Sequence, residues 1–157
     1  MLRRINQQMM RRMISTINSR QHLIHAVDMT SVVIVMGDMN AKVGEDNLDM
    51  EGVMGKHGLG NINDNGERLC DFCSMNGLVI TGTCFPHRTA HKATWVSPNW
   101  RTQNQIDHMM ICKNWRRSVD GTRVYRGADA ASDHYLLVMK IKLKLHRNPN
   151  RAKCNAR

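Results

Sequence analysis

The chain has 157 residues, enough for one domain with a buried core. Its 23 Lys and Arg against 13 Asp and Glu give a formal charge of +10. No apolar run approaches the roughly 18 residues of a membrane-spanning helix, so no membrane partner is expected. The five cysteines are odd in number and follow no secretory segment, which argues against a disulfide framework and favours an intracellular location, nuclear or cytoplasmic.

Basic residues flank an acidic centre. Residues 1–27 contain five arginines and no acid, and residues 135–157 are again basic without an acid. Such flanks suit a protein that holds a polyanion at its rim and a metal ion in its pocket. A solvated basic surface is the simpler interpretation, and charge alone favours it.

The first predicted elements are a helix, a strand and a loop. Ile and Met recur at helical spacing over residues 3–19, and the short β-branched run at residues 32–36 indicates a buried strand. Residues 44–66 are rich in Gly, Asn and Asp, which is typical of a long loop. A second helix is expected to begin near Asn65, its N-cap, and to end before Gly77.

The rest of the chain is predicted to consist of strands joined by short spacers. They are expected at residues 78–83, 93–97, 105–111, 122–125 and 135–145. In the last of them apolar residues alternate with lysines, a period of two that is typical of a strand. Because the spacers are too short for crossover helices, we expect antiparallel pairings and an α/β or α+β fold.

The first polar motif, Gly37-Asp38-Met39-Asn40, directly follows the predicted buried strand. A carboxylate and a carboxamide two residues apart can point at one common locus. Asp38 could ligate a hard cation or hold a water, and Asn40 could donate to a phosphate oxygen. Both residues are also ordinary turn formers, so the motif alone is weak.

The second motif, Gln105-Ile106-Asp107-His108, is predicted to lie within a strand. A carboxylate in such a strand is costly to bury unless it has a partner or a metal. Asp107 is therefore either a site residue or an edge-strand carboxylate that faces water.

The third motif, Ser132-Asp133-His134, leads into the last predicted strand. An Asp beside a His offers a metal-oriented carboxylate and an imidazole that can stabilise or protonate phosphate oxygens. A turn Asp with a surface His is the alternative.

The three motifs together are more informative than any one of them alone. Three carboxylates, Asp38, Asp107 and Asp133, each lie at or near a predicted strand within a polar motif. That set suits phosphodiester hydrolysis assisted by Mg²⁺ or Mn²⁺, because these ions take oxygen ligands and leave positions open for substrate. We expect the three carboxylates, Asn40 and His134 to converge on one spot.

The order of these motifs resembles the carboxyl-terminal half of the endonuclease/exonuclease/phosphatase superfamily. The matching segments are Gly37 to Ala41, Ala93-Thr94-Trp95, Gln105 to His108 and Ser132-Asp133-His134. Finer segments are similar to the endonuclease of RTE-type non-LTR retrotransposons and to craniofacial-development-type proteins: Asp38 to Gly44, Gly55 to Gly60, Asn65 to Leu69, Phe85-Pro86-His87 and His91 to Trp95.

The resemblance covers about residues 32–145 and implies a fold. It implies a partial four-layer α/β/β/α sandwich with mostly antiparallel strands and a missing amino-terminal half. Residues 1–31 would form an amino-terminal helix and linker, 32–145 the carboxyl-terminal part of the domain, and 146–157 a basic tail.

The resemblance also implies catalytic roles. Asp38 would position the attacking water, and Asn40 would contact the scissile phosphate. Asp107 would orient His134 or assist the hydrogen-bond network of the active site, and His134 would stabilise the transition state.

Binding roles follow from the same resemblance. Asp133 and Asp38 would hold the metal ion. Thr94 would contact the substrate backbone, and Ser132 would support the pocket. The substrate implied is nucleic acid, DNA in particular.

One departure from the family pattern affects the expected activity. The family's first half supplies an Asn, a metal-binding Glu and a Tyr, whereas residues 1–31 contain no Glu and no Tyr and have Asp28 as their only carboxylate. We therefore expect that the chain starts near the middle of the domain, that its fold is compromised and that it has little or no nuclease activity alone. A partner could supply the missing half.

Other interpretations remain open. The chain could be a catalytically inactive nucleic-acid-binding or interaction protein, or a fragment of a decayed retroelement. A structural zinc is not expected, because Cys70 and Cys73 lack a second ligand pair.

Overall fold

The computed structural model describes residues 31–128 and 132–144. The helix predicted at residues 3–19 and the basic tail predicted at 146–157 lie outside this part of the chain. Within it, no helix combines the length and the apolar character that crossing a lipid bilayer requires.

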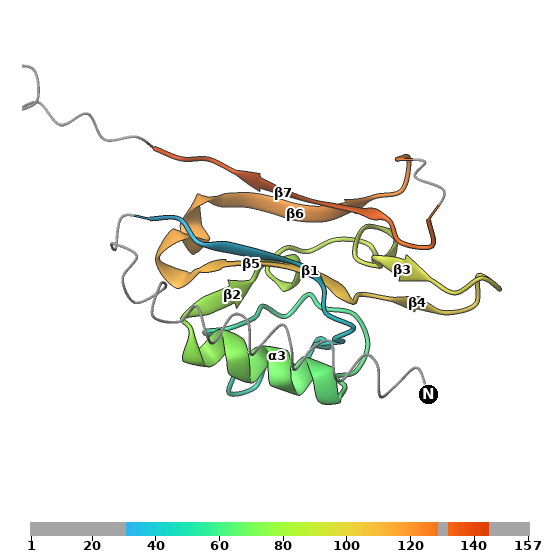
Figure 1. The fold of residues 1–157 in the computed structure, drawn as a ribbon, viewed down its shortest axis with the longest axis horizontal. Coiled ribbons are helices and arrows are strands. Elements are labelled where there is room, and N and C mark those ends of the chain that lie inside the picture. Colours follow the sequence, from blue (N-terminus) through green and yellow to red (C-terminus); the bar gives the residue numbers. More distant parts are fainter. Residues whose placement is uncertain (1–30, 129–131, 145–157) are drawn as a thin grey trace, which may run out of the picture.

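A three-stranded antiparallel sheet forms the centre of the fold (Figure 1). Its strands are β1 (Ile34–Asp38), β5 (Asp107–Cys112) and β2 (Leu78–Ile80), with β5 in the middle. The register of β1 and β5 pairs Asp38 with Asp107. Because β1 ends where β5 begins, both carboxylates come to the same end of the sheet.

Helix α3 (Asp64–Met75) packs against β2 on one face of the sheet (Figure 1). Asn63 caps the helix, because its side chain accepts a hydrogen bond from the Gly66 amide at 2.8 Å. Apolar side chains of the helix, the sheet and the loop after β1 form the buried core, which contains Met39, Ala41, Val43, Val53, Met54, Leu69, Phe72, Cys73, Leu78, Ile80 and Met110.

Two hairpins complete the described fold. β6 (Val119–Tyr125) pairs with β7 (Leu136–Ile141) on the side of the sheet opposite to α3, and β3 (Trp95–Val96) pairs with β4 (Gln103–Asn104) beyond the end of the sheet (Figure 1). Short 3₁₀ helices lie between strands: η1 (Thr81–Thr83), η2 (Thr89–His91) and η3 (Lys113–Ser118). The predicted fold class with mostly antiparallel strands is confirmed, and α3, the sheet and the β6–β7 hairpin form an α/β/β stack.

Some local predictions are wrong. The strand predicted at residues 32–36 lies two residues later and is not buried, because it is an edge strand of the described sheet that leaves Met36 60% exposed. The N-cap of α3 is Asn63 and not Asn65, because the Asn63 side chain reaches the Gly66 amide. The strand predicted at 78–83 ends at Ile80, where the chain turns into η1.

Replacing Gly66 by alanine is expected to destabilise the fold, although alanine is the better helix former. A Cβ at this position would lie 1.9 Å from the backbone oxygen of Lys42. We expect urea denaturation to show a loss of about 2–3 kcal/mol in the free energy of unfolding. Gly121→Ala is the control, since no atom of the described residues lies within 4 Å of its added Cβ. A Gly66→Ala protein as stable as the wild type would contradict the docking of α3 on Lys42.

Candidate active site

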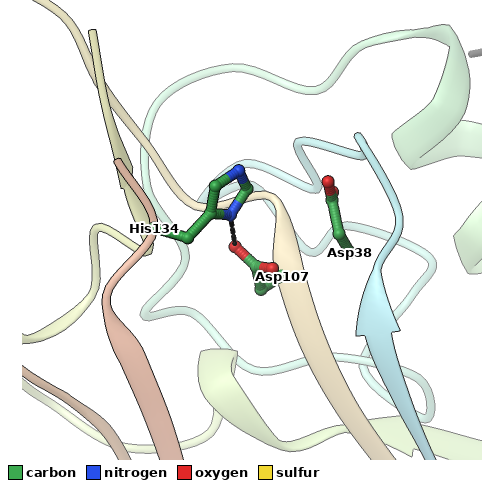
Figure 2. A group of neighbouring side chains, drawn as sticks. All are labelled: Asp38, Asp107 and His134. Carbon is green, nitrogen blue, oxygen red and sulfur yellow. Dashed lines mark hydrogen bonds and ion pairs between the residues drawn. The ribbon is translucent and has the colours of Figure 1, made fainter. Parts of the chain in front are cut away.

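The end of β1 and the start of β5 bring three titratable side chains together. Asp38, Asp107 and His134 each offer one ligand atom, and these atoms all lie within 4.8 Å of one another (Figure 2). His134 reaches the group from the segment before β7, which an antiparallel bridge to Trp95 holds in place. The structure thus brings one residue of each polar motif to the same place.

Asp107 and His134 are directly hydrogen-bonded. Nδ1 of His134 lies 3.0 Å from Oδ2 of Asp107, and both side chains are partly buried (Figure 2). Because an ionised carboxylate can only accept, Nδ1 carries the proton and Nε2 is the ring nitrogen available to a ligand. The His134 amide donates to Oγ of Ser132 at 3.1 Å, so Ser132 supports the turn that presents the imidazole.

Thr94 is completely buried beneath this pair. Its Oγ1 accepts hydrogen bonds from the backbone amides of Ile106 and Asp107, each at 3.0 Å, and its side chain is inaccessible to solvent. Its backbone oxygen accepts from the amide of Tyr135 at 2.7 Å. Thr94 therefore fixes the start of β5 and the segment of His134 together, whereas its predicted contact with substrate stays a prediction.

The carboxylate of Asp133 lies outside the cluster of three. Its Oδ2 accepts a hydrogen bond from the indole Nε1 of Trp95 at 2.7 Å, and its backbone oxygen accepts from the Val96 amide at 3.1 Å. These bonds join the third motif to β3. Metal binding by Asp133 stays a prediction.

Asn40 is tied to Asp38 by two bonds. Its backbone amide donates to Oδ1 of Asp38 at 2.8 Å, and its side-chain Nδ2 donates to Oδ2 at 3.4 Å. This turn keeps the carboxamide beside the carboxylate, as the motif predicts for residues two apart.

A pocket of about 320 Å³ lies beside the cluster. It is lined by Asn40, Lys42, Asn63, Trp95, Asn104, Ile106 and His134. Sequence reasoning gave no role to Lys42 or Asn63. A signal for Lys42 was present, since a cation two residues after Asn40 in the same turn can face the same anion.

His108 is a buried histidine directly behind the cluster. It is 1% exposed, its Nε2 lies 2.7 Å from the Ala41 oxygen, and its Nδ1 has no hydrogen-bond partner within the described residues. Burial lowers the pKa of His108 below its ordinary value. The ring is therefore neutral, with Nε2 as the donor to Ala41.

The buried His108 makes stability depend on pH. A histidine whose pKa is lower in the folded chain than its unfolded value of about 6.5 contributes stability above that pH and loses it as the pH falls. We expect the free energy of unfolding to decrease between pH 6.5 and 5, by up to about 1.4 kcal/mol per pH unit and proton. His108→Gln offers an amide N–H in place of the ring N–H and does not titrate, so the pH dependence of this variant in urea denaturation should be flatter. An unchanged slope in this variant would show that His108 does not titrate in this way.

Solved nucleases share this fold. The endonuclease domain of TRAS1, a telomere-specific non-LTR retrotransposon, matches with a TM-score of 0.56 and 20% identity over 83% of this chain and 52% of that one. A 3′-5′ exonuclease (NExo) from Neisseria meningitidis matches with a TM-score of 0.50 and 14% identity over 77% of this chain and 49% of that one. The chain therefore has the endonuclease/exonuclease type of fold, and the match spans about half of each neighbour.

Sequence comparison adds a relative with higher identity. This chain is 42% identical to craniofacial development protein 2 of Bos taurus and to that of Tragulus javanicus, over 125 residues or 80% of its length. The match spans 21% of the length of each relative. No family model matches the chain. The resemblance seen in the motifs is confirmed, and the chain is homologous to one part of craniofacial development protein 2.

Proposed function

We propose that this site hydrolyses phosphodiester bonds of nucleic acid, DNA in the first place, with Mg²⁺ or Mn²⁺ as cofactor. The observation that carries the proposal is the cluster of Asp38, Asp107 and His134, whose ligand atoms lie within 4.8 Å of one another. The nuclease neighbours of the same fold support nucleic acid as the substrate class.

The residues of the site have distinct tasks in the proposed reaction. Asp38 orients the attacking water and accepts its proton. His134 is held at Nδ1 by Asp107 and, in its protonated form, turns Nε2–H toward the phosphate oxygens, where negative charge develops. Asn40 donates a hydrogen bond to the same phosphate. Thr94 and Ser132 act indirectly, because their hydroxyl groups hold the backbone of Asp107 and His134.

The donor set fits a divalent cation. Asp38 and Asp107 stand opposite each other across an antiparallel ladder, where like charges destabilise the pairing unless a cation offsets them. We propose Asp38 and Asp107 of the cluster as ligands, because Mg²⁺ and Mn²⁺ prefer carboxylate oxygens. The metal-binding role predicted for Asp133, whose carboxylate lies outside the cluster, stays a prediction. The cation supplies polarisation of a phosphate oxygen and a more acidic water.

Cationic and aromatic groups near the site support a nucleic-acid substrate. Lys42 and Trp95 line the pocket. The guanidinium of Arg126 lies 5.0 Å from the ring centroid of Tyr135, the residue after His134. Cations neutralise backbone phosphates, and aromatic faces stack on bases.

Few side chains among the described residues are free to bind the metal ion. Oδ2 of Asp107 is engaged by His134, and Oδ2 of Asp133 is engaged by Trp95. We propose that further ligands come from the part of the domain that the match leaves uncovered, about half of each nuclease neighbour, supplied within a longer protein or by a partner. The chain alone is then expected to bind metal weakly and to have little activity.

Slow nicking of supercoiled plasmid is expected from the purified chain in excess Mn²⁺. Asp38→Ala should reduce the nicking rate by about a hundredfold or more, because the change removes the carboxylate that handles the water proton. The rate is measured on agarose gels over time, with and without EDTA.

Asp71→Ala is the matched control, since Asp71 is an exposed carboxylate on α3. It should nick as the wild type does. The inactive nucleic-acid-binding alternative predicts a different result. The chain would bind DNA with an affinity that falls with salt and is unchanged by Mn²⁺ or by Asp38→Ala, and it would not nick the plasmid.

A further inference from the structure

Asn40 has a backbone conformation that needs support. Its φ is +46°, in the left-handed region that side chains with a Cβ resist, although Asn resists it less than most. Its bonds to Asp38 are local, so they tie the two residues to each other without fixing where the pair points. The direction of Asn40 must be set by other elements.

The first turn of α3 contacts Asn40 directly. The Nδ2 groups of Asn65 and Asn63 donate to the backbone oxygen of Asn40, at 3.1 Å and 3.4 Å. This oxygen belongs to the peptide group that joins Asn40 to Ala41, and the orientation of that group depends on the backbone conformation of Asn40. Both side-chain amides therefore support the left-handed conformation.

Asn63 also forms hydrogen bonds with Lys42, two residues after Asn40. Its Oδ1 accepts from the Lys42 amide at 2.9 Å as well as from the Gly66 amide at 2.8 Å, and its own amide donates to the Lys42 oxygen at 3.0 Å. The cap of α3 is therefore shared with residue 42. The absence of a side chain at Gly66 allows the close approach, because a Cβ there would lie 1.9 Å from the Lys42 oxygen.

The start of β5 and the residue before it also hold this segment. The Met39 amide donates to the Ile106 oxygen at 3.0 Å, and Nε2 of His108 donates to the Ala41 oxygen at 2.7 Å. Asn40 thus lies between two anchors, and the contacts to its own carbonyl come from the α3 side.

We propose that Asn63 and Asn65 are positioning residues of the site, which hold Asn40 in its left-handed conformation and so aim its carboxamide, with Asp38, at the phosphate. The role of Asn40 toward phosphate rests on the proposed function. The holding of Asn40 by α3 does not, and it can be measured separately.

Variants of Asn65 can distinguish the positioning of Asn40 from the stability of helix α3. Within the described part of the chain its side chain makes a single hydrogen bond, the one to Asn40, and Asn63 supplies the cap. Asn65→Asp has the same shape but, when ionised, no donor. An acidic residue in the first turn of a helix stabilises that helix, so this variant should weaken the contact to Asn40 while α3 remains intact.

Amide hydrogen exchange of the full chain measures the contact. In Asn65→Asp we expect exchange at the Asn40 and Lys42 amides to accelerate by about tenfold, while the interior amides of α3 keep their rates. Asn65→Leu, a neutral variant without a donor, should behave in the same way. Asn61→Asp is the charge-matched control at an exposed Asn just before the helix and should change neither set.

Two results would overturn the proposal. One is unchanged exchange at Asn40 and Lys42 in both Asn65 variants. The other is equal acceleration throughout α3, which would show a general loss of helix structure. The nicking assay gives a second readout, with about a tenfold lower rate at unchanged Mn²⁺ dependence expected in Asn65→Leu. A wild-type chain that never nicks in excess Mn²⁺ contradicts the activity expected of the isolated chain, whereas the exchange result decides the proposed positioning.

Discussion

The antiparallel register of β1 and β5 sets two carboxylates against each other at one end of the central sheet. Asp38 and Asp107 are direct cross-strand partners, and like charges in such a pair weaken the ladder. Hydrogen bonds offset part of this cost, from the Asn40 amide to Asp38 and from His134 to Asp107. A bound cation would offset the rest. The pairing that builds the sheet therefore also brings together the carboxylates that we propose as a site for a metal ion and a phosphate.

The residues of the site depend on several structural elements. Asp38 and Asp107 are placed by the sheet, and His134 by its bridge to Trp95 in β3. Asn40 is placed by the first turn of α3, which contacts its carbonyl, and by the bond of its neighbour Met39 to Ile106. Thr94 links two of these supports, because it contacts both the start of β5 and the segment of His134. The first turn of α3 is a separate support, so a change there can disturb Asn40 without unfolding the sheet. Support from several structural elements suits a preorganised site, whose groups must be fixed before the substrate binds.

The sequence motifs indicated which residues lie together better than they indicated which residues hold them in place. Each polar motif beside an apolar run is weak alone, but the three occur together in the sequence, and one residue from each motif lies in the cluster. The N-cap of α3 was misassigned because Asn63 and Asn65 are equally good cap residues, and the choice depends on the Gly66 and Lys42 amides that Asn63 reaches. The edge position of β1 was missed because a β-branched run indicates a strand but does not show how many neighbours it has.

Paramagnetic broadening by Mn²⁺ tests the central claim most directly, because it reports where a cation binds without requiring turnover. Titration of the chain with Mn²⁺ should broaden the NMR signals of Asp38, Asp107 and His134 together, at the lowest ion concentrations. Asp38→Ala should shift this broadening to higher concentrations. Broadening that begins instead at the acidic residues of the loop at 45–51, with Asp107 and His134 unaffected, would contradict the account.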